Sequence, residues 1–268
     1  MGISCKNQAK IKIAAMSALW GAVGGEAFVP WIKEVKKAGY DGIAGFSGDF
    51  EPFYDEPGEL KNLLADNDLG LSSIDIWGIN LNFDQYRRVC GFMNEMGCEN
   101  LVMLGGYGKQ DGDFKALACV LDYIGEIAKA SGINMVYHNH SGLTGETFAD
   151  MDKLLAYADP SKMSVMVDTG HATCDFNDIP EVGERAVRFL RKYWDRVSFI
   201  EFKDFNDKTG LATPVGEGFC DHGAVFALLK EKGYCGWITV EQNGPSLGRT
   251  PFDCAKTSIE FIRKGLNI

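Results

Sequence analysis

Eight short apolar runs alternate with amphipathic stretches along the chain, and this alternation constrains the fold more than any other feature of the sequence. The runs are rich in Ile, Val, Leu and Met, and their length is typical of strands. They are IKIAAM (11–16), GIAGF (42–46), LSSID (71–75), NLVML (100–104), INMVYH (133–138), MSVMVD (163–168), VSFIEFK (197–203) and GWITVE (236–241). The amphipathic stretches predict helices at 29–38, 83–96, 114–130, 180–193, 222–232 and 252–264.

Strands that alternate with helices pair in parallel through right-handed crossover connections. The 268 residues are close to the roughly 250 residues of a typical (β/α)8 barrel. An open, doubly wound sheet is the alternative, but no GxGxxG motif opens the first predicted helix. We therefore predict an α/β protein with a single (β/α)8 TIM-barrel domain over residues 1–268.

Charge and composition exclude several kinds of partner. The formal net charge is −10 and the pI is near 4.9, which argues against binding the phosphate backbone of nucleic acid. No apolar run approaches the roughly 20 residues that span a bilayer, and the start, MGISCKNQAKIKIAAM, lacks an apolar signal core. We expect a cytoplasmic protein that acts on a small molecule and whose exposed barrel ends are suited to forming a homo-oligomer.

The cysteines give no sign of a metal-binding or redox motif. The chain has eight of them, none in a CxxC spacing, scattered through predicted helices and strands. This pattern predicts buried free thiols in a reducing compartment.

Polar residues gather where the last four predicted strands end. Because the C-terminal ends of the strands carry the chemistry in (β/α)8 barrels, we expect these side chains to converge. His138 and His140 are two residues apart, so in an extended segment both imidazoles face the same way. His171 follows the sixth predicted strand, and the last of the four histidines, His222, follows a GEG loop at the same end. The candidates are His138, His140, Asp168, His171, Glu201, Lys203 and Glu241.

Each candidate also has a structural interpretation. Asp168, in the stretch DTGH, could serve only as a helix N-cap. Glu201 lies between two apolar residues, so without a functional partner it would need a salt bridge, for example to Lys203. His222 begins a predicted helix and fits a structural role as well as a functional one. Several carboxylates and imidazoles at one barrel end together favour a divalent-metal site.

The second half of the chain resembles the xylose-isomerase-like barrel superfamily of sugar isomerases and epimerases. The motifs that carry the resemblance are DTGH (168–171), FKDF (202–205), GEG (216–218) and YCGWITVEQ (234–242). The similarity is closest to the inosose dehydratase branch, whose Tyr-His-X-His strand end matches residues 137–140 and whose Glu-Thr pair matches residues 146–147. The resemblance covers about residues 130–265.

The resemblance implies metal ligands at a glutamate near the fifth strand, at Asp168, at a histidine on the seventh strand and at Glu241. Glu201 stands where the seventh-strand histidine is expected, and His138 stands where many members carry glutamate. Such a Glu/His exchange would keep the set of ligands, or it could mark a barrel that has lost its metal. On the second strand, IAGF (43–46) lacks a glutamate that members often carry, which leaves the substrate open.

On this basis we expect one divalent ion, with either His138 or Glu146 completing the ligand set. The expected ligands are His138, Glu146, Asp168, Glu201 and Glu241. A site rich in carboxylate oxygens suits Mn, with Mg and Co as alternatives, better than a metal that prefers thiolates. We assign proton transfer and oxygen binding to His140, His171 and Lys203.

The expected function is a metal-dependent isomerase, epimerase or dehydratase of a sugar or keto-cyclitol. The ion would stabilise the enediolate that forms when a proton next to the carbonyl is removed. His138, deeper in the strand, would face the ion, and His140, nearer the mouth, would face the substrate. A DNA-repair endonuclease would need more histidine ligands and a basic groove. A metal-free sugar-binding or subunit barrel is the alternative.

Overall fold

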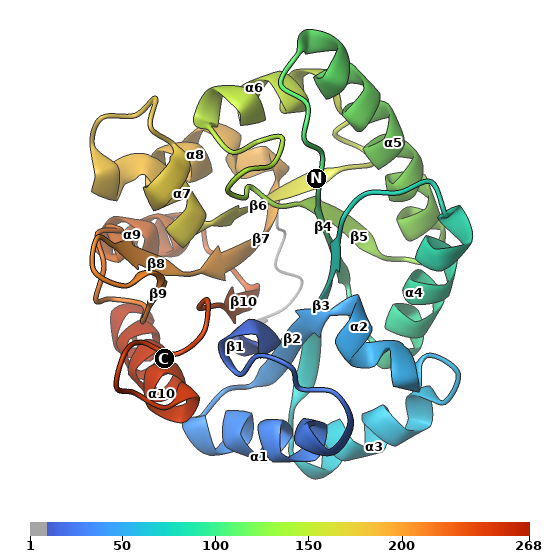
Figure 1. The fold of residues 1–268 in the computed structure, drawn as a ribbon, viewed down its shortest axis with the longest axis vertical. Helices are drawn as coiled ribbons and strands as arrows, with labels where there is room; N and C mark the ends of the chain where they lie inside the picture. Colours follow the sequence, from blue (N-terminus) through green and yellow to red (C-terminus); the bar gives the residue numbers. More distant parts are fainter. Residues whose placement is uncertain (1–9) are drawn as a thin grey trace.

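A closed barrel of eight parallel strands forms the centre of the computed structural model, which describes residues 10–268 (Figure 1). The strands follow the order β1-β10-β7-β6-β5-β4-β3-β2 around the barrel, so β10 closes the ring against β1. This arrangement confirms the predicted (β/α)8 fold. The barrel strands are β1 (Ile11–Met16), β2 (Gly42–Phe46), β3 (Gly70–Trp77), β4 (Asn100–Leu104), β5 (Asn134–Tyr137), β6 (Ser164–Asp168), β7 (Val197–Phe202) and β10 (Gly236–Val240).

Helices surround the barrel on its outside (Figure 1). All six predicted helices are present, although α8 begins at Arg185 because a 3-10 turn over Val182–Glu184 precedes it. No helix within residues 10–268 is long and apolar enough to cross a membrane. The helices are α1 (Phe28–Ala38), α2 (Ser47–Phe50), α3 (Pro57–Asp66), α4 (Phe83–Met96), α5 (Asp111–Ala130), α6 (Phe148–Tyr157), α7 (Thr169–Asp175), α8 (Arg185–Tyr193), α9 (His222–Glu231) and α10 (Pro251–Leu266).

Side chains alternate between the barrel interior and the helix layer along each strand. In β7, Ile200 and Phe202 pack in the large core formed with the helices, whereas Phe199 belongs to a separate inner apolar group. Glu201, two residues after Phe199, therefore points inward above that group. The inner group is Val102, Leu104, Val136, Leu143, Met166 and Phe199, with Trp237 packed against it. The barrel interior is thus apolar toward the N-terminal ends of the strands and polar at their C-terminal ends.

Trp237 fills the N-terminal end of the barrel against two glycines. A Cβ atom at Gly42 would lie 2.5 Å from the Gly70 carbonyl oxygen and 2.6 Å from the Trp237 ring. A Cβ atom at Gly70 would lie 2.9 Å from the same ring. Because neither position has room for a side chain, the Trp237 ring packs directly on the backbone of β2 and β3 and closes the barrel end opposite the polar residues.

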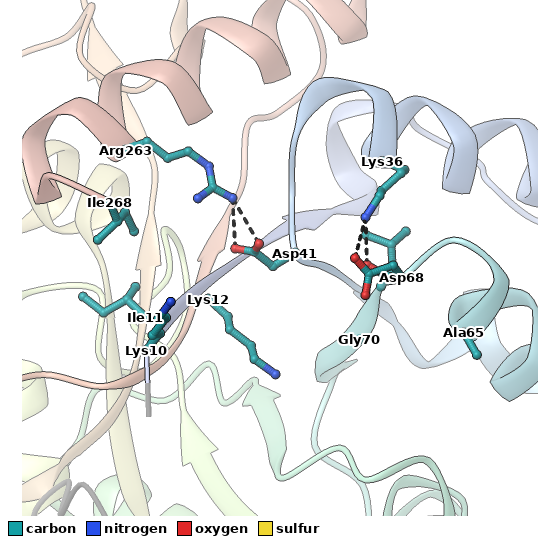
Figure 2. Close-up of a pocket in the computed structure, with 11 residues that line it drawn as sticks. Lys10, Ile11, Lys12, Lys36, Asp41, Ala65, Asp68, Gly70, Arg263 and Ile268 are labelled. Carbon is teal, nitrogen blue, oxygen red and sulfur yellow. Dashed lines mark hydrogen bonds and ion pairs between the residues drawn. The ribbon is translucent and has the colours of Figure 1, made fainter. Parts of the chain in front are cut away.

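A cavity of about 920 Å³ lies at this N-terminal end, outside the barrel interior (Figure 2). Figure 2 shows two ion pairs in its wall: Lys36 is 3.0 Å from Asp68, and Arg263 is 3.1 Å from Asp41. Its carboxylates are therefore already paired, and no predicted site residue lines it. The side chains predicted to form the functional site lie at the other end of the barrel.

A short antiparallel hairpin follows β7 and was not predicted from the sequence. It consists of β8 (Asp204–Asn206) and β9 (Gly210–Thr213). The Asn206 side chain accepts hydrogen bonds from backbone N–H groups in the turn, and Gly210 has a positive φ of 57°. These local interactions end the predicted strand 197–203 at Phe202, so Lys203 lies between the barrel and the hairpin.

The prediction of buried free thiols holds only in part. Cys90, Cys98 and Cys254 are free and buried, and Cys119 is free but exposed. Cys235 is disulfide-bonded, so the prediction is wrong at this position. Cys5, and the prediction that the start of the chain lacks a signal segment, lie outside the described residues.

Gly42→Ala should destabilise the protein, because the new methyl group would overlap the Gly70 carbonyl and the Trp237 ring. Overpacking in a filled core costs about 1–3 kcal/mol, and we expect a loss of that size. Gly91→Ala, inside α4 with open space around it, should instead stabilise the fold by about 0.5–1 kcal/mol. Urea unfolding measures both changes. An unchanged midpoint for Gly42→Ala would contradict the packing described for this barrel end.

Candidate metal centre

Four buried side chains from four strands converge at the C-terminal end of the barrel. His138 directly follows β5, Asp168 ends β6, Glu201 lies in β7 and Glu241 directly follows β10. Each offers one ligand atom, and these atoms all lie within 4.8 Å of one another. We call these four residues the metal-centre group.

The register of the strands explains why the group forms. Asp168 pairs with Glu201 in the β6–β7 ladder, so both side chains leave neighbouring strands at the same height. Thr239 of β10 pairs with Glu201 from the other side, and Glu241 lies two residues further along. The backbone N–H of His138 donates to the backbone carbonyl of Met103 in β4, which continues the β4–β5 pairing by one residue.

The two carboxylate oxygens of Asp168 have different environments. Its Oδ1 accepts hydrogen bonds from the backbone N–H groups of Gly170 (2.7 Å) and His171 (2.9 Å), which caps α7. Its Oδ2 is buried and has no hydrogen-bond partner within the described chain. The N-cap role considered from the sequence therefore exists and leaves the second oxygen available to a cation.

The two positions of the expected histidine–glutamate exchange, His138 and Glu201, face each other. His138 Nε2 lies 3.2 Å from Glu201 Oε1 and 3.7 Å from Asp168 Oδ2. An exchange of histidine and glutamate between these positions therefore keeps both kinds of ligand atom at the same place. The salt bridge considered between Glu201 and Lys203 is not among the ion pairs of residues 10–268. Lys203 instead lies 2.9 Å from Glu241 Oε1.

The charges of this group are not balanced by Lys203 alone. Burial lowers the pKa of His138 to about 3, so its imidazole is neutral. Burial and the neighbouring Glu241 raise the pKa of Glu201 well above its usual range, and burial raises the pKa of Asp168 to about 6. Burial acts in the same direction on Glu241, but the Lys203 charge and a hydrogen bond from Glu201 lower its pKa to about 2.

A divalent cation fits these residues. When all three carboxyl groups are ionised, their charges exceed that of the single ammonium by two in a buried site, which a divalent ion would neutralise. Carboxylate oxygens with one neutral imidazole nitrogen are typical ligands of such ions. Binding would displace the proton that the raised pKa keeps on Glu201 and would engage Asp168 Oδ2, which accepts no hydrogen bond within the described chain.

His140 and His171 form a second layer beside the metal-centre group. Their ring centroids are 4.0 Å apart, and the His140 ring is 5.6 Å from the His138 ring. His140 is half-buried, whereas His138 is only 1% exposed, so His140 lies nearer the opening. The exposed Trp77 ring contacts His140 edge-to-face at 4.7 Å. This order of depth agrees with the one predicted from the sequence.

Glu146 lies outside the metal-centre group, in the loop after β5. One of its carboxylate oxygens accepts the backbone N–H of Gly142 at 2.9 Å, and the other lies 3.4 Å from Lys109 Nζ. The adjacent Thr147 caps α6 by accepting from the Asp150 N–H. The Glu-Thr pair therefore stabilises a loop, and the structure places His138, not Glu146, among the four converging residues.

His222 has a structural environment. Its Nδ1 lies 3.6 Å from Asp204 Oδ2, and its ring packs against Phe202 and Phe261. Asp204 also accepts the backbone N–H groups of Gly216, Gly218 and Cys220, which holds the GEG loop against the barrel. The structural alternative for His222 is therefore the one that the contacts support.

Three buried or half-buried side chains near the site were not singled out from the sequence. Asp75 ends the predicted strand 71–75, accepts from Ser73 Oγ at 3.2 Å, and has a pKa raised by burial and by Glu241. Its strand-end position was a usable signal. Ser141 and Asp175 contact His171, and the spacing of four residues between His171 and Asp175 in α7 was the signal for that contact.

The chain matches the model of a protein family described as "Xylose isomerase-like TIM barrel" over residues 32–265. The chain belongs to the xylose isomerase-like TIM barrel family. This match confirms the resemblance seen in the motifs. It begins at residue 32, whereas the motif resemblance began at about residue 130. Among curated relatives, the inosose dehydratase of Lacticaseibacillus casei is 30% identical over 175 residues, 59% of this chain and 56% of that protein. The chain thus spans a little over half the length of that relative.

Solved structures of several proteins share this fold. A D-allulose 3-epimerase from Methylomonas sp. superimposes with a TM-score of 0.77 at 18% identity, covering 96% of this chain and 99% of that one. The IolI protein, whose structure holds a zinc atom, superimposes with a TM-score of 0.73 at 17% identity, covering 96% and 98%. At these identities the similarity establishes only the barrel fold. The chemistry of the site has to be inferred from the residues of this chain.

Glu201→Gln should weaken Mn²⁺ binding by at least about tenfold, because it removes a charged oxygen from the metal-centre group. Glu146→Gln makes the same chemical change outside the group and should leave the affinity unchanged. Isothermal titration of chelator-treated protein with Mn²⁺ measures both. Loss of binding in Glu146→Gln with retention in Glu201→Gln would show that the glutamate of the loop, not that of β7, is the ligand.

Proposed function

We propose that the protein is a divalent-metal-dependent isomerase, epimerase or dehydratase acting on a sugar or keto-cyclitol. The observation that carries the proposal is the buried metal-centre group, whose four ligand atoms lie within 4.8 Å of one another at the active end of the barrel. The similarity to an inosose dehydratase and to a D-allulose 3-epimerase supports the substrate class.

We propose Mn²⁺ as the ion, with Mg²⁺ and Co²⁺ as alternatives, because three of the four ligands are carboxylates. The proposed ligands are His138, Asp168, Glu201 and Glu241. When bound there, a divalent ion would polarise the carbonyl and hydroxyl oxygens of the substrate and stabilise negative charge that develops on them.

Isomerisation, epimerisation and loss of water all begin with removal of a proton from a carbon next to a carbonyl, which requires a base. Burial lowers the pKa of half-buried His140, so its ring is neutral near pH 7 and can accept a proton. His171 lies 4.0 Å from it, ring centroid to ring centroid, and offers a second imidazole. The arrangement supports these two histidines as proton carriers.

Lys203 is suited to a different role. Burial opposes its charge, but Glu241 and Asp168 raise its pKa, so its side chain stays protonated. A charged ammonium has three donors and no acceptor, so Lys203 would donate to a substrate oxygen rather than act as a base. Its Nζ is 2.9 Å from Glu241 and 3.6 Å from Asp168, which holds it beside the proposed ion.

A metal-free sugar-binding or subunit barrel is the second candidate, and the same lysine favours it. Lys203 already compensates one carboxylate without an ion. Protonation of Glu201, whose pKa is raised, would then remove one of the two remaining negative charges. Metal analysis of the purified protein distinguishes the two candidates.

A screen of keto-sugars and inososes with Mn²⁺ in D₂O tests the proposed function. We expect deuterium to enter the substrate next to its carbonyl, and the exchange to stop after chelation and in Asp168→Ala, which lacks the carboxylate oxygen proposed to bind the ion. Mass spectrometry measures the exchange.

His140→Gln is the matched control, because it leaves the four proposed ligands in place. It should keep the metal and lose about two to four orders of magnitude in turnover, the usual contribution of an acid–base group. A protein that binds no divalent metal and exchanges no proton with any of these substrates would support the metal-free barrel instead.

A further inference from the structure

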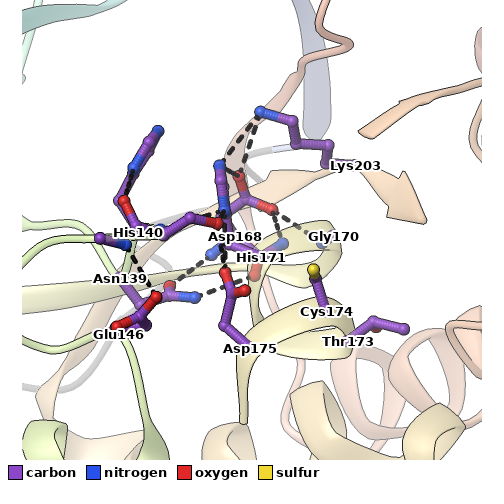
Figure 3. A network of polar contacts seen from close by, with 12 residues as sticks. Asn139, His140, Glu146, Asp168, Gly170, His171, Thr173, Cys174, Asp175 and Lys203 are labelled. Atoms are coloured by element: carbon purple, nitrogen blue, oxygen red, sulfur yellow. Dashed lines mark hydrogen bonds and ion pairs between the residues drawn. The ribbon is translucent and has the colours of Figure 1, made fainter. Parts of the chain in front are cut away.

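Both ring nitrogens of the buried His171 have close polar neighbours of known hydrogen-bonding character. Nδ1 lies 2.8 Å from Ser141 Oγ and 3.2 Å from Asp175 Oδ2. Nε2 lies 3.5 Å from Lys203 Nζ. Figure 3 shows His171 between Asp175 on one side and Lys203 on the other. These neighbours decide which nitrogen carries the hydrogen.

On the Nε2 side, the only neighbour within hydrogen-bond distance among the described residues is the Lys203 ammonium, and it can only donate. The acceptor Asp168 Oδ2 lies farther away, at 3.8 Å. The Lys203 ammonium has three N–H donors and no lone pair. A hydrogen on Nε2 would therefore point a second donor at the ammonium in a site where both side chains are at most 1% exposed. The contact is favourable only if Nε2 is unprotonated and accepts.

On the Nδ1 side, both side-chain neighbours can only accept. Ser141 Oγ donates its hydrogen to Asp175 Oδ2 at 2.5 Å, so the hydroxyl faces Nδ1 with its lone pairs. The Asp175 carboxylate has no hydrogen to give. The backbone N–H of Ser141 also lies 3.3 Å from Nδ1, but this is the longest of the three contacts and involves a neutral donor. The anionic acceptor and the hydroxyl oxygen together favour a hydrogen on Nδ1.

We propose that Asp175, acting with Ser141, is a positioning residue that holds His171 as the Nδ1–H tautomer. The Nε2 lone pair then faces the site beside Lys203. In this form Nε2 accepts a hydrogen bond or a proton and can donate only after it has been protonated, so it would engage a hydroxyl group of the substrate. This assignment deepens the proposed function and, for its use in catalysis, rests on it.

The geometry of α7 supports this role for Asp175. Asp168 caps the start of the helix, and Asp175 is its last residue, so the helix places His171 and Asp175 one turn apart on the same side. Only 12% of the Asp175 side chain is exposed, which strengthens its contact with the ring. Ser141 follows His140 directly, so the loop that carries one imidazole also orients the other.

The tautomer can be measured directly. Two-bond ¹H–¹⁵N spectra of protein labelled at histidine distinguish the two ring nitrogens, and His171→Gln identifies the His171 signals. We expect the Nδ1–H form in the full-length protein, both after chelation and with Mg²⁺ added. Asp175→Asn should convert His171 partly or wholly to the Nε2–H form. Asp207→Asn, a similar loss of charge on the exposed hairpin turn, should leave the spectrum unchanged.

Two results would overturn the inference: an Nε2–H form in the wild-type protein, or an unchanged His171 signal in Asp175→Asn. If the tautomer is as expected, Asp175→Asn should lower kcat roughly 10–100-fold with little change in KM. A loss of this size is usual when a hydrogen-bond partner that orients a functional histidine is removed. The predicted tautomer in a protein that processes no sugar or cyclitol would support the positioning role while contradicting the proposed function.

Discussion

The C-terminal end of the barrel depends on one constraint, the burial of three carboxyl groups whose ligand atoms lie within 4.8 Å of one another. Such groups repel one another and are poorly solvated, and the pKa of Glu201 is raised for both reasons. Lys203 compensates one negative charge, and the neutral His138 adds none. The excess negative charge therefore favours either a proton on Glu201 or a bound divalent cation. The same charge that destabilises the ionised group would thus provide the affinity for the ion.

The remainder of the barrel holds these charges at fixed positions. An apolar layer containing Phe199 and Met166 lies beneath them and keeps water away from their lower side. At the opposite end, Trp237 packs against two glycines and closes the barrel. Above, three N–H bonds to Asp204 hold the loop that follows the hairpin. A site assembled from strand ends in this way loses little conformational entropy when it binds an ion, because its side chains are already ordered.

The sequence predicted the strands and the four converging residues because both follow from local patterns: alternation sets each strand, and the barrel brings all strand ends together. It could not place Glu146, because the position of that side chain depends on Lys109 and on the folded path of a loop. The contact between Ser141 and Asp175 was likewise hidden, since 34 residues separate them. The hairpin after β7 was missed because its strands are only three and four residues long.

Anomalous X-ray scattering from crystals grown with Mn²⁺ tests the central claim most directly, because it locates the ion without relying on activity. We predict one strong peak at about 2.0–2.4 Å from His138 Nε2 and from carboxylate oxygens of Asp168, Glu201 and Glu241. Lys203 should remain beside Glu241 without contacting the ion. No peak among these four residues at saturating Mn²⁺, or a peak held by Glu146 instead, would contradict the account.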